Sequence, residues 1–102
     1  MLSAKQIQNS YNDLYVQLRE YIWPATIVAN IADLEIACYK AFPDIPYIKY
    51  QFNRLKTDCL RYVDDEELQE AFEDFDEMID GSETLYAKLD KRREGAENIE
   101  NL

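Results

Sequence analysis

Apolar residues recur along this chain at alternating intervals of four and three positions, which places side chains on one face of an α-helix. The first series consists of Ile7, Tyr11, Leu14, Leu18 and Tyr21. Ser3 and Gln6 form a capping-box pattern just before it, and this pattern predicts where the helix begins. Trp23 precedes a proline and is therefore disfavoured in helical conformation, so we expect the first helix to end near Ile22.

Three further helices are predicted by the same reasoning. The second begins at Pro24 and ends before the loop of residues 42–46, and its apolar face holds Ile27, Ile31, Leu34 and Cys38, widened by Val28, Tyr39 and Phe42. The third covers about residues 47–62 and buries Ile48, Phe52, Leu55, Cys59 and Tyr62. The fourth covers residues 64–80 and buries Leu68, Ala71, Phe72, Phe75, Met78 and Ile79. The apolar series slips at Val63-Asp64, so we expect a break there rather than one long helix.

The pattern after residue 80 is shorter and more polar. Asp80-Gly81 is a typical helix stop, and a short fifth helix is expected between Ser82 and Gly95. Residues 95–102 are expected to form a flexible tail. Together the pattern predicts an all-α fold. It is an antiparallel four-helix bundle over residues 1–94, in which the short C-terminal helix packs across one end or extends away.

Charge is distributed unevenly over these helices. Residues 64–80 hold ten acidic residues and no basic one, and the net charge of the whole chain is −10. Asp64 and Glu67 suit the start of a helix as a capping pattern, whereas Asp76, Glu77 and Asp80 oppose the helix dipole at roughly 0.3–1 kcal/mol each. The acidic face is either a solvated surface, partly neutralised by bases of the third helix or of residues 88–93, or a recognition surface.

As a recognition surface, this region has the following candidate partner-binding residues: Glu66, Glu70, Glu73, Glu77, Asp80, Lys88, Lys91, Arg92 and Arg93. Ten charges along a helix of ~25 Å give about one per 2.5 Å, near the one per ~1.7 Å of duplex DNA. One hypothesis is therefore an acidic helical inhibitor that mimics nucleic acid and binds a basic nuclease or defence protein. Direct binding of nucleic acid is disfavoured by the acidic balance of the chain, because such binding demands a basic patch.

The residue types argue against catalysis. The chain has no histidine, no glycine-rich phosphate loop and no Cys-x-x-Cys pair. Carboxylates on an exposed helix face lack the burial that catalytic carboxylates need. A calcium loop with Gly81 at its sixth position would place Met78 and Ala87 at ligand positions, where neither can bind the ion. We therefore expect no enzyme activity, no cofactor and no metal site.

Three smaller features bear on the surroundings and the surface. Cys38 and Cys59 fall on apolar helix faces and are expected to be reduced core thiols, although a bridge between them stays open. Trp23, Tyr47 and Tyr50 flank loops, where an aromatic side chain either covers the core or anchors an interface, and covering the core is favoured. No secretory signal is recognised and the longest near-apolar run is too short for a bilayer, so we expect a cytoplasmic protein.

Several short motifs resemble the enterocin A type of immunity protein for class IIa (pediocin-like) bacteriocins. They are Ala4-Lys5-Gln6-Ile7 and Tyr11-Asn12-Asp13 on the first helix, Ile48-Lys49 and Asn53-Arg54-Leu55 on the third, and Glu66-Glu67-Leu68 at the start of the fourth. The resemblance covers roughly residues 3–90, with matching length and helix order.

This resemblance implies a cytoplasmic four-helix bundle that protects the producing cell from its own bacteriocin, and a peripheral position at the inner membrane face stays open for this chain. The implied partner is the complex of the bacteriocin with its receptor, the mannose phosphotransferase permease, approached from inside the cell. The C-terminal half would decide which bacteriocin is recognised. The strongly acidic charge departs from many relatives, which are basic, so the cognate toxin is not identified. A monomer is favoured, although a seam for a dimer stays open.

Overall fold

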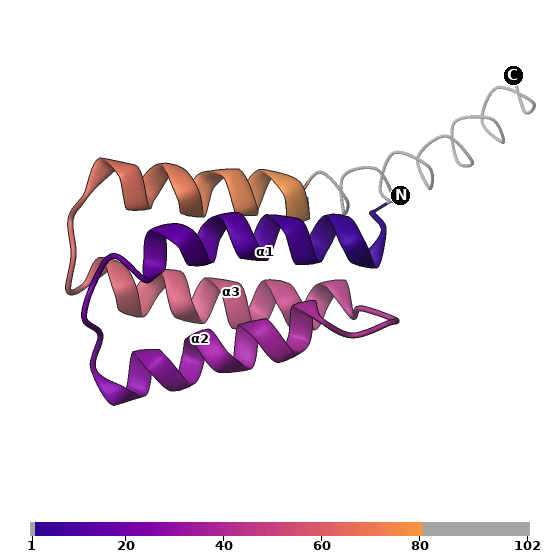
Figure 1. Cartoon of the computed structure of the whole chain (residues 1–102), viewed down its shortest axis with the longest axis horizontal. Coiled ribbons are helices and arrows are strands. Elements are labelled where there is room, and N and C mark those ends of the chain that lie inside the picture. The colour runs from indigo at the N-terminus through magenta and orange to yellow at the C-terminus, as the bar shows by residue number, and fades with distance from the viewer. Residues whose placement is uncertain (1, 81–102) are drawn as a thin grey trace, which may run out of the picture.

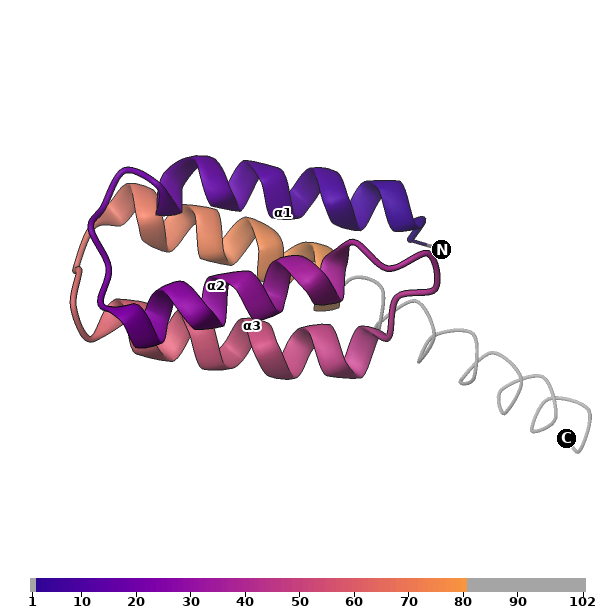
Figure 2. The same cartoon turned by 60° about the horizontal axis from the view of Figure 1, so that its bottom comes forward.

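The computed structural model describes residues 2–80, which form four helices lying side by side (Figures 1 and 2). They are α1 (Ala4–Leu18), α2 (Ala25–Cys38), α3 (Ile45–Leu60) and a fourth helix whose described part covers residues 66–80. In both views the fourth helix, coloured orange, lies beside α1, and α2 lies beside α3. The described chain contains no strand, which confirms the all-α prediction. The predicted fifth helix and tail lie outside the described residues.

The ends of α1 follow from local hydrogen bonds. The Ser3 hydroxyl accepts the backbone N–H of Gln6 at 3.1 Å, and the Gln6 side chain accepts the backbone N–H of Ser3 at 2.8 Å. This confirms the predicted capping box. The helix ends at Leu18, four residues before the predicted Ile22. The Trp23 indole N–H donates to the Leu18 carbonyl at 2.8 Å and satisfies one of the carbonyls left open at the helix end.

Acidic side chains cap the later helices at positions that differ from the prediction. Asp44 accepts the backbone N–H of Tyr47 at 3.2 Å, so α3 begins inside the predicted loop. The fourth helix is capped by Asp65, whose carboxylate accepts the N–H of Glu67 at 2.9 Å. The predicted cap, Asp64, instead accepts the side-chain amide of Gln69 at 2.8 Å. The break between α3 and the fourth helix is confirmed.

The core lies where the four apolar faces meet. Its buried apolar side chains are Ile7, Tyr11, Leu14, Leu18, Ile27, Leu34, Ala37, Cys38, Ile48, Phe52, Leu55, Cys59, Leu68, Phe72, Phe75 and Ile79. Phe52 of α3 stacks on Phe75 at 4.6 Å between ring centroids and meets the edge of Phe72 at 5.9 Å. These rings join α3 to the fourth helix and contribute beyond the area they bury.

The predicted apolar faces were too wide at their margins. Val28, Tyr39, Phe42 and Tyr62 were expected in the core but are exposed. Conversely, Asn30 and Gln51 are buried, and the Asn30 side-chain amide donates to Asp58 of α3 at 2.8 Å. Trp23 packs against the core as expected, whereas Tyr47 and Tyr50 are exposed.

Both cysteines are buried and free, so they are the reduced core thiols that the sequence predicts. Burial raises the pKa of the Cys38 and Cys59 thiols to about 12, which keeps both in the unreactive thiol form near neutral pH. Among the described helices, none combines the length and the apolar character needed to cross a membrane.

One side-chain hydrogen bond joins two loops at the same end of the bundle. The Tyr21 hydroxyl, in the connection between α1 and α2, donates to the Asp65 carboxylate at 2.5 Å. Asp65 lies in the connection between α3 and the fourth helix, so residues 44 positions apart are held together. The bond lowers the pKa of Asp65 and raises that of Tyr21 to about 12.

Candidate functional site: an acidic groove beside the fourth helix

The fourth helix presents acidic side chains toward both of its neighbours, and α3 neutralises those that face it. Lys49 lies 2.7 Å from Asp80, and Lys56 lies 3.8 Å from Asp76. These ion pairs confirm that bases of the third helix neutralise part of the acidic face. Asp80, a predicted partner-binding residue, is therefore engaged within the fold.

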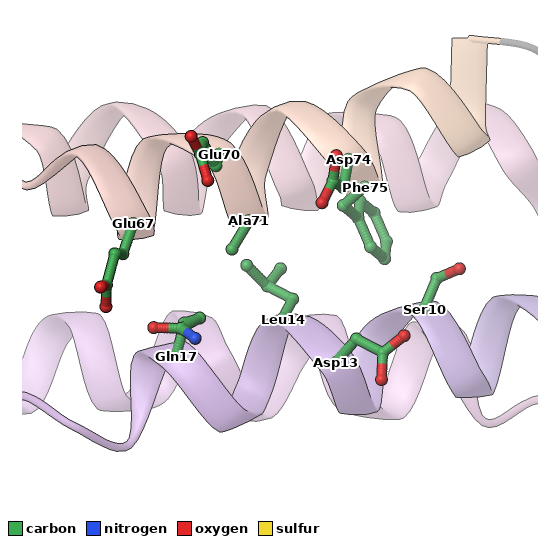
Figure 3. A pocket seen from close by; sticks show the side chains of 9 residues that line it. All are labelled: Ser10, Asp13, Leu14, Gln17, Glu67, Glu70, Ala71, Asp74 and Phe75. Carbon is green, nitrogen blue, oxygen red and sulfur yellow. The ribbon is translucent and has the colours of Figure 1, made fainter.

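Toward α1 the carboxylates line a groove of about 480 Å³ (Figure 3). The lining residues come from α1 and from the fourth helix: Ser10, Asp13, Leu14, Gln17, Glu67, Glu70, Ala71, Asp74 and Phe75. Figure 3 shows Leu14 and Ala71 pointing toward each other across the gap, with carboxylates on both sides. Four of the lining residues are acidic and none is basic. We call this set of residues the acidic groove.

The predicted partner-binding residues are only partly brought together here. Glu66, Glu70, Glu73 and Glu77 are all exposed and follow one another at helical intervals of four and three along the fourth helix. Of these, only Glu70 also lines the acidic groove. The remaining candidates, Lys88, Lys91, Arg92 and Arg93, lie outside the described residues.

Three carboxylates of the groove were not among the predicted site residues: Asp13, Glu67 and Asp74. Asp13 was recognised as lying off the apolar series of the first helix. However, only the packing of α1 against the fourth helix brings it into the same groove as Glu67 and Asp74. The sequence signal that could have found it is the polar series Ser10, Asp13 and Gln17, at intervals of three and four beside the buried one.

The groove mainly accepts hydrogen bonds and attracts cations, and Ser10 and Gln17 add a hydroxyl and a side-chain amide that can donate. Its ionised carboxylates are acceptors only, and between them Leu14 and Phe75 are core residues whose apolar atoms reach the groove. Nowhere in residues 2–80 do three or more potential ligands come together to hold a metal ion. The arrangement suits a basic segment of another protein, with Lys or Arg beside the carboxylates and an apolar side chain between them.

Comparison with models of known protein families, with curated proteins and with solved structures finds no match to this chain.

Proposed function

We propose that this chain is a non-catalytic immunity protein that protects its cell against a class IIa bacteriocin. It acts in the cytoplasm, at the complex of the bacteriocin with the mannose phosphotransferase permease. The observation that carries the proposal is where the quoted motifs lie. Ala4-Lys5-Gln6-Ile7 and Tyr11-Asn12-Asp13 belong to α1, Ile48-Lys49 and Asn53-Arg54-Leu55 to α3, and Glu66-Glu67-Leu68 opens the fourth helix.

The acidic groove is the surface we assign to partner recognition. Its carboxylates meet no basic side chain of the groove, so their negative field is directed at whatever approaches between α1 and the fourth helix. An acidic binding surface of this kind selects basic partner segments and speeds their association at low salt. In this proposal the partner offers a basic segment on the cytoplasmic side of the receptor complex.

Expression in a bacterium that carries the permease and is sensitive to class IIa peptides tests the proposal. We expect the chain to protect cells against at least one peptide of a panel. Asp74→Lys should weaken protection because it reverses a charge inside the groove, whereas Glu73→Lys, a matched change outside the groove, should preserve it. Absence of protection against every peptide, at confirmed expression of folded protein, would contradict the proposal.

A second candidate function, inhibition of a basic nuclease by nucleic-acid mimicry, is favoured by the exposed series Glu66, Glu70, Glu73 and Glu77. The charge density is lower than the sequence suggests. Asp76 and Asp80 are paired with lysines, and Asp64 and Asp65 accept hydrogen bonds within the fold, which leaves six of the ten acids uncommitted. Six charges over ~25 Å are about one per 4.2 Å, less than half the density of duplex DNA.

The triple variant Glu66→Lys, Glu73→Lys and Glu77→Lys separates the two functions, because none of these three residues lines the acidic groove. A nucleic-acid mimic would lose salt-sensitive binding to a basic nuclease in this variant. An unmodified chain that binds no basic nuclease at low salt removes the second candidate and leaves the immunity proposal untouched.

A further inference from the structure

A second groove lies on the opposite side of α1, between α1 and α2. It has a volume of about 400 Å³ and is lined mainly by aromatic and aliphatic side chains. Around it, Tyr15, Val28 and Tyr39 are 42%, 53% and 47% exposed. We call these residues and the lining of the groove the α1–α2 face. Large apolar side chains gathered on one face are typical of an interaction surface rather than of scattered exposure.

The floor of this groove contains a polar group without a partner. Tyr11 is 1% exposed, and its ring lies 6.0 Å from both Tyr15 and Tyr39. Its buried hydroxyl makes no hydrogen bond. Burial, and next the charge of Glu35, raise the pKa of Tyr11 well above its usual range. Buried hydroxyls normally have a partner, so an additional polar group is expected near this position.

Charge distinguishes the α1–α2 face from the rest of the molecule. Arg19 and Glu35 are the two charged residues of the groove, and their charges cancel. Neither forms an ion pair within residues 2–80. Because the whole chain carries −10, a second copy is repelled by the acidic surface of the fourth helix but meets no net charge here.

We propose that the α1–α2 face binds a second copy of this chain in an antiparallel, two-fold symmetric dimer. Arg19 follows the last turn of α1, whereas Glu35 lies near the other end of the groove, by Tyr11. A two-fold axis perpendicular to the helices reverses the direction of the second copy. Arg19 of each copy then lies at the end of the groove where the other copy has Glu35. A self-complementary face of this kind is what an isologous dimer requires.

Size measurement of the full chain in solution, by light scattering and sedimentation over a range of protein and salt concentrations, tests the dimer. We expect dissociation to a monomer on dilution. We also expect tighter association at higher salt, because salt screens the repulsion between two chains of charge −10 while apolar contacts persist. A monomer at every concentration and salt level overturns the proposal, and so does an association that weakens steadily with salt.

Two matched variants locate the interface. Val28→Asp places a charge on the α1–α2 face and should weaken the dimer at least about tenfold, the effect of roughly 1.4 kcal/mol. Tyr50→Asp adds the same charge at an exposed apolar position of α3 and should leave association close to that of the unmodified chain. Equal effects of the two variants would place the contact elsewhere. Circular dichroism establishes that each variant is folded.

Charge exchange tests the geometry. Arg19→Glu and Glu35→Arg should each weaken the dimer, because each places like charges at both ends of the groove. The double variant restores opposite charges and keeps the net charge at −10, so it should recover association. Failure of the double variant to recover, while both single variants weaken the dimer and stay folded, overturns the antiparallel arrangement. This test does not depend on the proposed immunity function.

Discussion

The two flanks of the fourth helix carry the same kind of acidic side chain but meet different neighbours. Toward α3, Asp76 and Asp80 form ion pairs with lysines, and the stacked rings of Phe52 and Phe75 pack the two helices together. Toward α1, Glu67 and Asp74 line an open groove together with Asp13. The acidic face of this helix therefore consists of two parts with different surroundings. The helix packed beside it decides whether a carboxylate holds the fold together or stays available for a partner.

The largest loss of stability is expected when the aromatic contact between α3 and the fourth helix is removed. Phe52→Ala deletes the ring that stacks on Phe75 and leaves a cavity, so we expect the free energy of unfolding to fall by about 3–5 kcal/mol. Urea denaturation measures this loss. Tyr50→Ala, at an exposed position of the same helix, should change it by less than about 0.5 kcal/mol. Comparable losses in the two variants would mean that the ring stack is not the main link between these helices.

The α1 flank should respond in the opposite direction to a change of charge. Asp74→Lys removes repulsion from Glu70 and Asp13 in the acidic groove, so we expect a gain in unfolding free energy of roughly 0.2–1 kcal/mol. Glu73→Lys makes the same charge change outside the groove and should give a smaller gain. The difference should shrink as salt screens the carboxylates. A loss of stability in Asp74→Lys would show that the carboxylates do not repel one another.

Removing a base from the α3 flank gives the matching experiment. Lys56→Gln leaves Asp76 without its ion pair, and both side chains are about one-third exposed. We therefore expect a loss of only a few tenths of a kcal/mol, which disappears at high salt. Thermal unfolding at two salt concentrations measures it. A loss of stability in Lys56→Gln together with a gain in Asp74→Lys would support the difference between the two flanks of the fourth helix. Changes of the same sign would contradict it.

The smallest effect is expected at the partly buried hydrogen bond between Tyr21 and Asp65, the residue that caps the fourth helix. Because the pKa of Asp65 is lowered on folding, the bond contributes fully above the ordinary aspartate value of 3.8 and is lost as pH falls through the lowered pKa. Because the pKa of Tyr21 is raised from 10.0 to about 12, the contribution is also lost as pH rises through that range.

Tyr21→Phe should therefore be slightly less stable than the unmodified chain near neutral pH. The two proteins should converge at strongly acidic and strongly alkaline pH. Unfolding measured across the pH range gives the difference directly. A difference that is constant at all pH values would assign the effect of the variant to packing instead of the hydrogen bond.

Periodicity predicted the four helices and most of the core, because each apolar side chain repeats at the helical interval whatever its neighbour is. It failed at the margins of the helices. Val28 and Tyr39 look like core residues in sequence, but α1 and α2 leave a groove between them. Asn30 and Gln51 look like surface residues but point into the bundle, where Asn30 finds Asp58. Such outcomes depend on how closely two helices pack.

The candidate site was predictable in kind but not in place. The sequence predicted a strongly acidic fourth helix and its partial neutralisation by α3. It did not predict which acids would be engaged, because whether a lysine of α3 lies within reach, as Lys49 does for Asp80, depends on how the two helices pack. Asp13 entered the site from a helix whose charge is unremarkable in sequence. The register between helices, rather than composition, assembled the acidic groove.

The single tryptophan turns this architecture into an optical reporter. Trp23 lines the α1–α2 groove, and its ring centroid lies 5.5 Å from that of Tyr21. Its indole N–H donates a hydrogen bond to the carbonyl of Leu18, the last residue of α1. Unravelling of that helix end frees the indole to water, which would shift its emission to longer wavelength. Coverage of the groove would instead shield the indole from a dissolved quencher. One fluorophore, with no label added, thus distinguishes opening of the bundle from association of its copies.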